Sequence, residues 1–308
     1  MPDTSYIHGF GAHLPDRVVT NDELASQLNC TPEWIESVSG IRERRWAEEE
    51  SVADLAAAAA RDCLARAAVE ASQIGLLIVS SGSAERRFPG PASSVAAALG
   101  LNATPVLDLP IASAGSIFGL SLASHLASAY GDVLLVGAEK MSAVIKGATL
   151  DQNTAILFGD GAGAALVSAR KGRFEVLDSV LHTDGAYRDE LALEWGSPLR
   201  MNGLIVILQA ARKLPGVIDE ILKRQGIPAS EVTQFVMHQA NQNLIVRVAK
   251  GRGVDPGLMF SNVGKYGNTS SASMLIAASE WDPSPGPVVF AGFGAGFNWG
   301  ALLARFVG

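Results

Sequence analysis

Residues Val106–Gly119 read V-L-D-L-P-I-A-S-A-G-S-I-F-G, and this stretch decides how the rest of the chain is interpreted. The apolar run Val106–Leu109 predicts a strand that ends at Pro110, and small residues then lead into an apolar helix expected to continue to about Tyr130. Ser113 is expected where that helix begins. The first N–H groups of a helix lack partners and its dipole favours negative charge, so this serine is either an N-cap or a nucleophile.

The composition indicates a large globular chain with an acidic surface. The 308 residues exceed one ordinary domain and predict two units of about 150 residues. Apolar residues make up 48% of the chain and charged residues only 18%, so a large core is feasible. The net charge of −7 and the pI of about 5.3 argue against general nucleic-acid binding, which needs a basic surface. Any acidic partner therefore needs a local basic patch.

The cysteines and the N-terminal segment bear on the cellular compartment. Cys30 and Cys63 have no CxxC spacing and belong to no metal-binding cluster, which is typical of a reducing cytoplasm. Met1–Phe10 lacks the cationic and apolar regions of a signal peptide. The sequence also has no uncharged run of about 18 apolar residues that would span a bilayer. We therefore expect a cytoplasmic protein without a metal site or a membrane segment.

The two halves of the sequence follow one plan. Each half has a strand that ends in polar residues, Ser80–Ser83 in the first and His238–Asn241 in the second. Each then has a turn of small residues that enters an apolar helix, at 113–116 and at 270–273. Repetition of this order predicts a duplicated mixed α/β unit.

The last strands of the two halves resemble each other most clearly. Residues 163–170 read G-A-A-L-V-S-A-R, and residues 300–306 read G-A-L-L-A-R-F. We therefore predict two halves, 1–172 and 173–308. Ligands of such folds gather beyond the carboxyl ends of the strands, and Ser113, His238 and Asn268 each follow a strand end.

The glycine-rich run G-D-G-A-G-A at 159–164 invites a nucleotide-binding interpretation. A dinucleotide fingerprint opens a helix, whereas this run is expected between two apolar strands. We therefore predict no nucleotide site there.

Six motifs follow one another along the chain in a characteristic order. They are D-x-x-x-x-S-A-G at 108–115, L-F-G-D-G-A-G-A at 157–164, M-x-G-x-x-V at 201–206, H-Q-A-N at 238–241, G-N-T-S-x-A-S at 267–273 and F-G-x-G-F-x-W-G at 293–300. With T-P-E-W at 31–34 and S-G-I-R-E-R at 39–44, they resemble the β-ketoacyl-acyl-carrier-protein synthase III family over essentially the whole chain. The resemblance implies a thiolase-like fold, in which two duplicated mixed-sheet α/β halves form a five-layered arrangement.

The resemblance also implies an activity and its catalytic residues. The family uses a Cys–His–Asn triad for ping-pong acyl transfer from a thioester, followed by decarboxylative condensation with malonyl-acyl carrier protein in fatty-acid or related lipid and polyketide synthesis. His238 and Asn268 match the histidine and the asparagine, and Ser113 occupies the nucleophile position. One oxyanion hole would be formed by the side chains of His238 and Asn268, and another by the backbone N–H groups of Ser113 and Ala295.

Serine at position 113 departs from the family and leaves three interpretations open. A hydroxyl is far less acidic than a thiol and needs a base, a role that His238 would fill. Ser113 is then a natural nucleophile of a divergent branch, an engineered Cys→Ser change that traps an intermediate, or part of an inactive acyl-binding homologue. A competing activity is acyl transfer to a hydroxyl or amine without condensation. Ser116 departs as well, since the family usually has phenylalanine there.

The coenzyme A site is expected to be weakened. By resemblance, substrate or coenzyme A would contact Trp34, Gly203, Ile207, Asn241 and Phe293. Three arginines that the family would place here are replaced by Val38, Gln152 and Asn243. Loss of these cations removes charge-assisted contacts to phosphate, which predicts weaker coenzyme A binding or delivery of the acyl group by a carrier protein.

Two further contacts follow from the resemblance. Arg247, Lys250 and Arg252 form either a docking patch for an acidic acyl carrier protein or a solvated basic helix face. Phe88 matches a loop that lines the acyl pocket of the partner chain, so we expect a homodimer. The expected substrates are acyl-CoA or acyl-carrier protein and malonyl-carrier protein, with no further cofactor.

Overall fold

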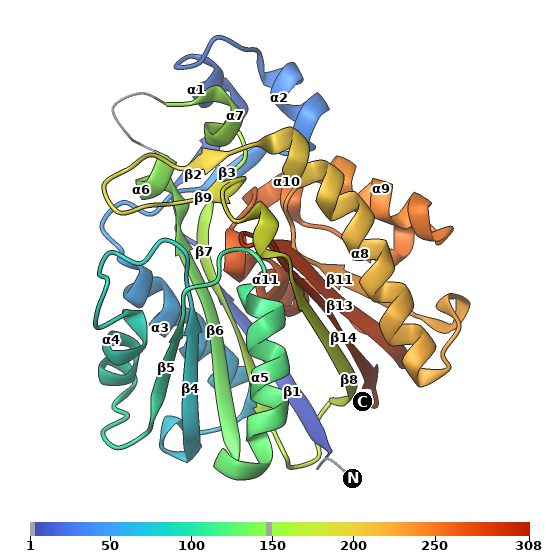
Figure 1. Cartoon of the computed structure of the whole chain (residues 1–308). Coiled ribbons are helices and arrows are strands. Elements are labelled where there is room, and N and C mark those ends of the chain that lie inside the picture. The colour runs from blue at the N-terminus through green and yellow to red at the C-terminus, as the bar shows by residue number, and fades with distance from the viewer. Residues whose placement is uncertain (1–3, 146–149) are drawn as a thin grey trace.

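A mixed ten-stranded sheet forms the centre of the computed structural model, which describes residues 4–145 and 150–308 (Figure 1). The strand order across the described sheet is β12-β11-β13-β14-β8-β1-β7-β6-β4-β5. The strands of the first half are β1 (Ser5–His13), β4 (Ile74–Ser80), β5 (Val106–Leu109), β6 (Asp132–Lys140) and β7 (Asp160–Ser168). Those of the second half are β8 (Phe174–Thr183), β11 (Gln234–Met237), β12 (Met259–Phe260), β13 (Gly286–Gly294) and β14 (Asn298–Phe306).

The order of strands repeats outward from the centre, where β1 and β8 pair antiparallel. On one side β7, β6, β4 and β5 follow β1, and on the other side β14, β13, β11 and β12 follow β8. Pairing repeats as well: β4 is parallel to β5 and β6, just as β11 is parallel to β12 and β13. The predicted mixed α/β fold with two like halves is therefore confirmed.

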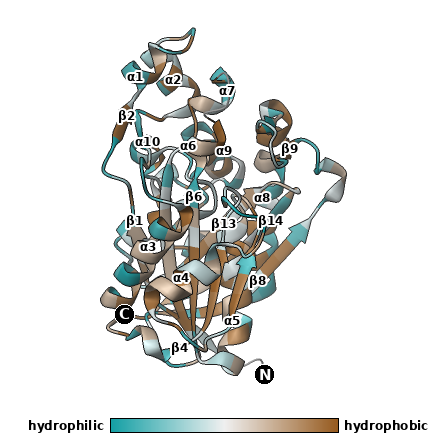
Figure 2. Cartoon of the chain, turned by 90° about the vertical axis from the view of Figure 1, so that its left-hand side faces the viewer, coloured by the Kyte–Doolittle hydropathy of each residue, from teal (hydrophilic) through white to brown (hydrophobic). Residues whose placement is uncertain are grey.

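Helices divide the molecule into five layers. On the outer face of the first half lie α3 (Val52–Ala67) and α4 (Pro91–Leu99), and on the outer face of the second half lie α8 (Gly203–Gln225) and α9 (Gln242–Arg252). The middle layer contains α5 (Gly115–Tyr130) and α11 (Ser273–Glu280), which pack between the two halves of the sheet. Hydrophobic residues concentrate in the strands, as Figure 2 shows. All three helical layers therefore bury an apolar face against the sheet.

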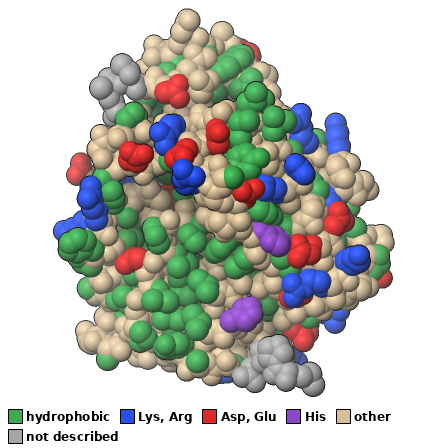
Figure 3. Space-filling model, viewed as in Figure 1, with side chains coloured by type: hydrophobic (Ala, Val, Ile, Leu, Met, Phe, Trp, Pro, Cys, Tyr) green, Lys and Arg blue, Asp and Glu red, His purple; other side chains and the backbone are tan. Residues whose placement is uncertain are grey.

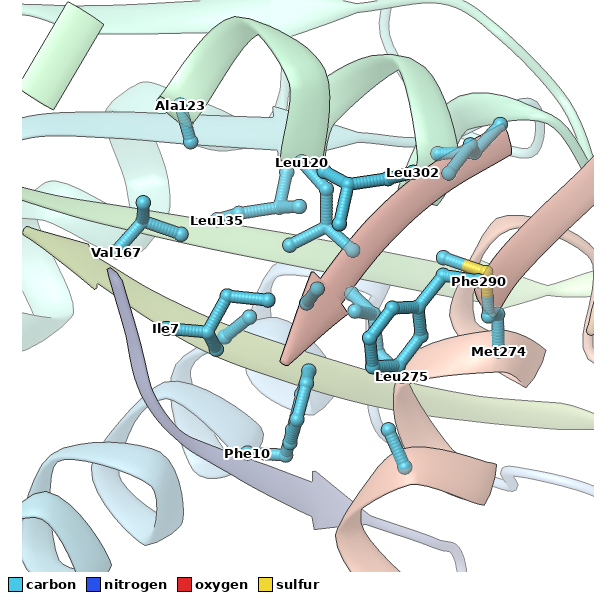
Figure 4. Packing of buried hydrophobic residues seen from close by; sticks show 14 of the residues in the cluster. Ile7, Phe10, Leu120, Ala123, Leu135, Val167, Met274, Leu275, Phe290 and Leu302 are labelled. Carbon is cyan, nitrogen blue, oxygen red and sulfur yellow. The ribbon is translucent and has the colours of Figure 1, made fainter. Parts of the chain in front are cut away.

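The middle layer holds the core beneath the predicted site. Leu120 and Ala123 of α5 and Met274 and Leu275 of α11 are fully buried; Met274 and Leu275 lie beside Phe290 of β13, and Ala123 lies further along α5, toward Leu135 and Val167 (Figure 4). Burial of each large apolar side chain contributes about 1.5–3 kcal/mol. This packing fixes the beginnings of α5 and α11 relative to each other, and both helices begin beside the site.

Smaller elements cover the carboxyl ends of the strands. They are β2 (Val18–Thr20), α1 (Asn21–Ala25), α2 (Pro32–Ser39), β3 (Glu43–Arg45), α6 (Met141–Ile145), α7 (Gln152–Ala155), β9 (Leu191–Ala192), β10 (Arg200–Met201) and α10 (Val263–Tyr266). The sequence sets the ends of α2: Thr31 accepts a hydrogen bond from the N–H of Trp34, Pro32 occupies the first turn, and Gly40 adopts a φ of 74° at the C-cap.

Three sequence predictions about local structure are wrong. After an expected strand at Asp132–Gly137 the sequence predicts a loop at Lys140–Asn153, but this stretch contains α6 and the start of α7; its residues 146–149 lie outside the described residues. The two strands expected around the glycine-rich run are one strand, because Ala155 ends α7 and β7 begins only at Asp160. Gly161 and Gly163 therefore lie within β7, and Gly159 directly precedes it. Helix α5 begins at Gly115, two residues after Ser113. None of the described helices is long and apolar enough to cross a membrane.

Candidate active site

Ser113 lies in the turn between β5 and α5 and does not cap the helix. Its φ is 62°, in the left-handed region, whereas Ala114 holds the N-cap position and no side chain caps α5. The Ser113 side chain is largely buried, with the residue 8% exposed. A non-glycine residue keeps this conformation only where its surroundings enforce it, which is typical of functional sites. The N-cap interpretation of Ser113 therefore fails.

The end of β13 supports this turn from the opposite half. The N–H of Ala114 donates to the carbonyl of Ala112 at 2.7 Å and closes the turn. A Cβ atom at Gly294 would lie 2.2 Å from that carbonyl oxygen and 2.9 Å from the Cβ of Ser113. Only glycine permits this approach, so the second half of the chain buttresses the nucleophile position of the first.

Asn268 lies in the strap, the segment of residues 268–273, which belongs to the second half and contacts the first half. Its N–H donates to the carbonyl of Leu157 at 2.8 Å, and its carbonyl accepts from the N–H of Gly159 at 3.1 Å. The side-chain Oδ1 accepts from the N–H of Ser270 at 2.9 Å. Since Oδ1 is held in this way, Nδ2 is the free end of the carboxamide. Among the described residues it has no hydrogen-bond partner, so it is available to a ligand.

Ser270 brings this strap to Ser113. The N–H of Ser113 donates to Oγ of Ser270 at 2.9 Å, and the two hydroxyl oxygens lie 3.4 Å apart. Ser270 has a φ of 46° and begins a short 3₁₀ turn (Ser270–Ala272) that leads into α11. The predicted nucleophile and the predicted asparagine are thus joined through one residue.

His238 follows β11 and is held by the first residue of α11. Its Nδ1 lies 2.6 Å from Oγ of Ser273, which also accepts from the N–H of Gln239 at 3.0 Å. Burial lowers the pKa of His238 from 6.5 to about 4, so the imidazole is neutral at pH 7. Within the described ranges no hydrogen bond joins His238 to Ser113 in this resting arrangement.

The three predicted side chains therefore meet at residues 268–273. Ser113 comes from the first half, whereas His238 and Asn268 come from the second, and all three are buried. The part of the chain that the structure describes contains no group of three or more His, Cys, Asp or Glu side chains placed to hold a metal ion. The site contains instead a hydroxyl, a neutral imidazole and a free amide donor, a set suited to acyl chemistry.

Sequence reasoning missed a buried carboxylate behind the site. Glu139, at the end of β6, is 0% exposed and accepts from Oγ of Ser83 at 2.6 Å and from the N–H of Gly82 at 3.0 Å. It also accepts from Oγ of Ser271 at 2.7 Å. Glu139 thus ties the loop that follows β4 in the first half to the 268–273 strap. The only sequence signal was the serine-rich character of 80–83 and 270–273.

The residues expected to bind substrate lie near α2, α8 and α9. Trp34 and Val38 expose just over a third of their surface on α2, and Ile207 exposes a similar share on α8. Asn241 caps α9 and donates from Nδ2 to the carbonyl of Val38 at 3.0 Å. Asn243, which replaces an expected arginine, donates to the carbonyl of Ser37 at 3.0 Å. Amide contacts between α2 and α9 thus stand where phosphate-binding cations were expected.

Two other residues were predicted to bind substrate: one lies in the interior, and the other begins a helix. Phe293 is 4% exposed and packs against Phe297 with ring centroids 4.8 Å apart. Gly203 is the first residue of α8. Neither position by itself assigns a ligand.

The basic residues after His238 divide into two groups. Arg247 and Lys250 are exposed on α9. The side chain of Arg252 is only 7% exposed and pairs with Asp219 of α8. Arg252 therefore binds within the fold, and we drop it from the docking patch.

Comparison with known proteins gives the family. The profile of 3-oxoacyl-[acyl-carrier-protein] synthase III matches residues 107–185, and that of its C-terminal domain matches residues 222–306. The β-ketoacyl-[acyl-carrier-protein] synthase III of Oleidesulfovibrio alaskensis is 35% identical and covers 99% of this chain and 100% of its own.

Solved structures agree with this likeness. The 3-oxoacyl-[acyl-carrier-protein] synthase III of Aquifex aeolicus superposes with a TM-score of 0.94 at 32% identity, covering 98% of this chain and 100% of its own. The priming β-ketosynthase of the R1128 polyketide pathway reaches a TM-score of 0.91 at 31% identity, covering 99% of this chain and 98% of its own. The predicted thiolase-like fold is confirmed, and the chain belongs to the 3-oxoacyl-[acyl-carrier-protein] synthase III family.

Proposed function

We propose that this acyltransferase takes an acyl group from a thioester onto Ser113 and then condenses it with malonyl-acyl carrier protein. The observation that carries the proposal is the convergence of Ser113, His238 and Asn268 on the 268–273 strap. Family membership supports the reaction type, and the geometry supports the assignment of roles to these three residues.

In the acylation step, Oγ of Ser113 attacks the thioester carbonyl. A C–O bond forms, the C–S bond breaks, and the donor leaves as a free thiol. His238 is the base that takes the serine proton, because its lowered pKa keeps the imidazole neutral at pH 7. The proton then passes to the departing thiolate. The N–H groups of Ser113 and Ala295 stabilise the oxyanion that forms in between.

Ser273 allows His238 to serve in both half-reactions. When Nδ1–H donates to Oγ of Ser273, Nε2 carries a lone pair and acts as a base. When the Ser273 hydroxyl donates to Nδ1 instead, Nε2 carries the proton and acts as a donor. The contact of 2.6 Å accommodates both directions: the Ser273 hydroxyl keeps its hydrogen and rotates, and the ring proton lies on Nδ1 in the first case and on Nε2 in the second.

In the condensation step, the malonyl thioester loses CO2 and leaves an enolate. Nε2–H of His238 and Nδ2 of Asn268 donate to the enolate oxygen, and the free Nδ2 is already oriented by the contact of Oδ1 with Ser270. The enolate carbon attacks the ester carbonyl, a C–C bond forms, the C–O bond to Ser113 breaks, and Oγ of Ser113 takes a proton from solvent water. The product is a 3-oxoacyl carrier protein.

Incubation with acyl thioesters tests this proposal directly. Intact-protein mass with peptide mapping should show an acyl group on Ser113 that disappears, with release of CO2, when malonyl-carrier protein is added. Acyl loss to a hydroxyl or amine acceptor without CO2 would establish plain acyl transfer instead. No gain of mass, and no CO2 release, would leave an acyl-binding homologue and overturn the proposal.

We propose that carrier protein rather than coenzyme A is the acyl donor. Arg247 and Lys250 offer two exposed cations to an acidic carrier, whereas Val38 and Asn243 offer none to the phosphates of coenzyme A. Gln152 removes a third expected cation. Trp34 of α2 remains partly exposed. We therefore propose docking of the carrier on α9, next to α2.

A homodimer formed along β5 and α5 is the proposed assembly. β5 is an edge strand, and hydrophobic side chains gather over α5 and the adjoining strands (Figure 3). The residues of this apolar face, all partly or well exposed, are Leu107, Leu109, Ile111, Phe118, Leu122 and Leu126. Phe88 exposes 86% of its surface beside Arg87, which lies over the ring of Trp195 at 5.5 Å. A second copy would cover this face and receive Phe88 in its acyl pocket.

The remaining assignments concern organisation and surroundings. We propose that residues 1–172 and 173–308 are the two duplicated halves. Along the chain, β7 is the last strand on the β1 side of the sheet, and β8 is the first strand of the other side. We propose a cytoplasmic location, with both cysteines free and the pKa of Cys63 raised to about 12 by burial. The proposed chemistry uses acyl thioesters alone and needs no cofactor.

A further inference from the structure

Ser270 contacts the predicted nucleophile through its side chain and the predicted asparagine through its backbone. Its hydroxyl accepts the N–H of Ser113 at 2.9 Å, and its own N–H donates to Oδ1 of Asn268 at 2.9 Å. Ser270 is 1% exposed, so solvent does not replace either contact. A change at Ser270 therefore affects both proposed oxyanion holes, one through its side chain and the other through its backbone N–H.

The backbone shows that this contact is enforced. Within the described residues, only Ala68, Ser113 and Ser270 combine a side chain with a positive φ. Two of these three face each other across the site. Non-glycine residues rarely adopt this conformation, and facing pairs persist only where the structure holds both.

The hydroxyl of Ser270 binds a backbone N–H group of the proposed oxyanion hole. The N–H of Ser113 is the donor that an acyl oxyanion requires, and in the resting site Oγ of Ser270 is its acceptor. That oxygen lies 2.9 Å from the nitrogen and 3.4 Å from Oγ of Ser113. An oxyanion donor works at 2.7–3.1 Å from the oxygen that it stabilises. The serine oxygen thus keeps the N–H directed into the hole until a substrate oxygen replaces it.

We propose that Ser270 is a positioning residue for acylation of Ser113, an inference that rests on the proposed function. Its hydroxyl holds the Ser113 N–H and so acts on acyl transfer. Its backbone N–H orients Asn268 and so acts on decarboxylation. Loss of the hydroxyl alone therefore slows acylation more than it slows decarboxylation, a split that general loss of stability would not produce.

The variant Ser270→Gly isolates the hydroxyl. Glycine adopts a φ of 46° without strain and keeps the N–H that binds Asn268. Single-turnover acylation is followed by intact-protein mass, and decarboxylation of malonyl-carrier protein by CO2 release. We expect the ratio of the acylation rate to the decarboxylation rate to fall about tenfold, the effect of one hydrogen bond on a reacting group.

Ser271→Ala is the matched control. Its buried hydroxyl lies one residue further along the strap and binds Glu139 at 2.7 Å and the carbonyl of Ser80 at 3.1 Å, without contact to Ser113. Both half-reactions should change in the same proportion in this variant. A ratio that is unchanged or raised in Ser270→Gly would overturn the role of Ser270.

A second background separates this inference from the proposed function. The pair of variants is also made with Ser113→Cys, whose thiol is the better nucleophile. Acylation of the cysteine but not of the serine would overturn Ser113 as a nucleophile, while the rate ratio in the cysteine background would still decide the role of Ser270. If neither background is acylated, the turn at 113 is not an acylation site and both proposals are wrong.

Discussion

At the scale of single residues, the chemistry of the site depends on which atom stands at position 113. A thiolate is readily formed beside a helix N-terminus, whereas a hydroxyl needs a base, and an oxygen ester is a poorer acyl donor to carbon than a thioester. We expect Ser113→Cys to raise the rate of condensation by at least about a hundredfold. The measurement is formation of 3-oxoacyl-carrier protein from an acyl thioester and malonyl-carrier protein.

Ser116→Cys is the control for this substitution. Ser116 is buried on the first turn of α5, where an added thiol should leave condensation unimproved. If Ser113→Cys brings no gain, the pocket has moved to other acyl chemistry.

His238 should make stability depend on pH in a defined window. Burial lowers its pKa from 6.5 to about 4, so between these pH values the unfolded chain binds a proton that the folded protein does not. The free energy of unfolding should therefore fall as the pH is lowered through this window, by about 3 kcal/mol in full. Urea unfolding of the native protein and of His238→Gln, followed between pH 7 and 4, measures this contribution. Equal slopes in the two proteins would contradict the assignment.

The same residue tests the triad. His238→Ala should fold and yet lose turnover, because the imidazole is both the base of acylation and a donor in decarboxylation. CO2 release and thermal unfolding, measured on the same preparation, separate the two effects. An active His238→Ala enzyme would falsify the role proposed for the histidine.

At the scale of elements, the strap and β6 must approach closely. A Cβ atom at Gly137 of β6 would lie 2.4 Å from the carbonyl oxygen of Ser271. We expect Gly137→Ala to push the strap away, to destabilise the fold by about 2–3 kcal/mol and to reduce acylation strongly. Gly9→Ala is the matched control, since nothing lies within 4 Å of a Cβ atom at that strand glycine. The thermal unfolding temperature and the acylation rate are measured for both variants. If Gly137→Ala matches Gly9→Ala in both, the close packing of the strap on β6 is excluded.

Helix α9 should carry the contact with the acidic carrier. Reversal of both exposed charges, Arg247→Glu with Lys250→Glu, should raise the KM for malonyl-carrier protein roughly tenfold, and added salt should shrink the difference. The kcat should change little, because neither side chain reaches the site. Lys223→Glu, an exposed charge reversal at the end of α8, is the control. An unchanged KM in the double variant would remove α9 from the docking surface.

Helices and strands were predictable from the sequence where neighbouring residues alone form a continuous apolar pattern. The strand Val106–Leu109 agrees with β5, and the helix expected to Tyr130 agrees with α5 apart from its first residues. The turn itself was not predictable, because the φ of 62° at Ser113 depends on Gly294, which lies far away in the sequence. The same holds for Ser270 and Ser273: their hydroxyls are ordinary turn serines until tertiary packing brings Ser113 and His238 to them.

At the scale of the whole molecule, duplication explains why the site lies where it does. Each half places a strand end and a helix start on the same side of the sheet, and β1 and β8 pair antiparallel where the halves meet. The helix starts of α5 and α11 therefore face each other within the middle layer. Ser113 from the first half thus lies against the 268–273 strap of the second half, which carries Asn268 and also holds His238, so neither half alone contains all three residues.

The apolar face over β5 and α5 leads to the final prediction, which concerns the oligomeric state. Leu107 exposes 44% of its surface on an edge strand, whose unpaired backbone groups invite pairing with another chain. In a two-fold dimer each substitution occurs twice, so Leu107→Lys brings two charges into one interface and should yield a monomer by sedimentation velocity. Acylation should fall with it, because Phe88 would no longer line the pocket of a partner. Val307→Lys, at a site of similar exposure near the chain end, should remain a dimer. A native protein that sediments as a monomer, or a dimeric Leu107→Lys, would place the interface elsewhere and leave Phe88 without a role in the acyl pocket.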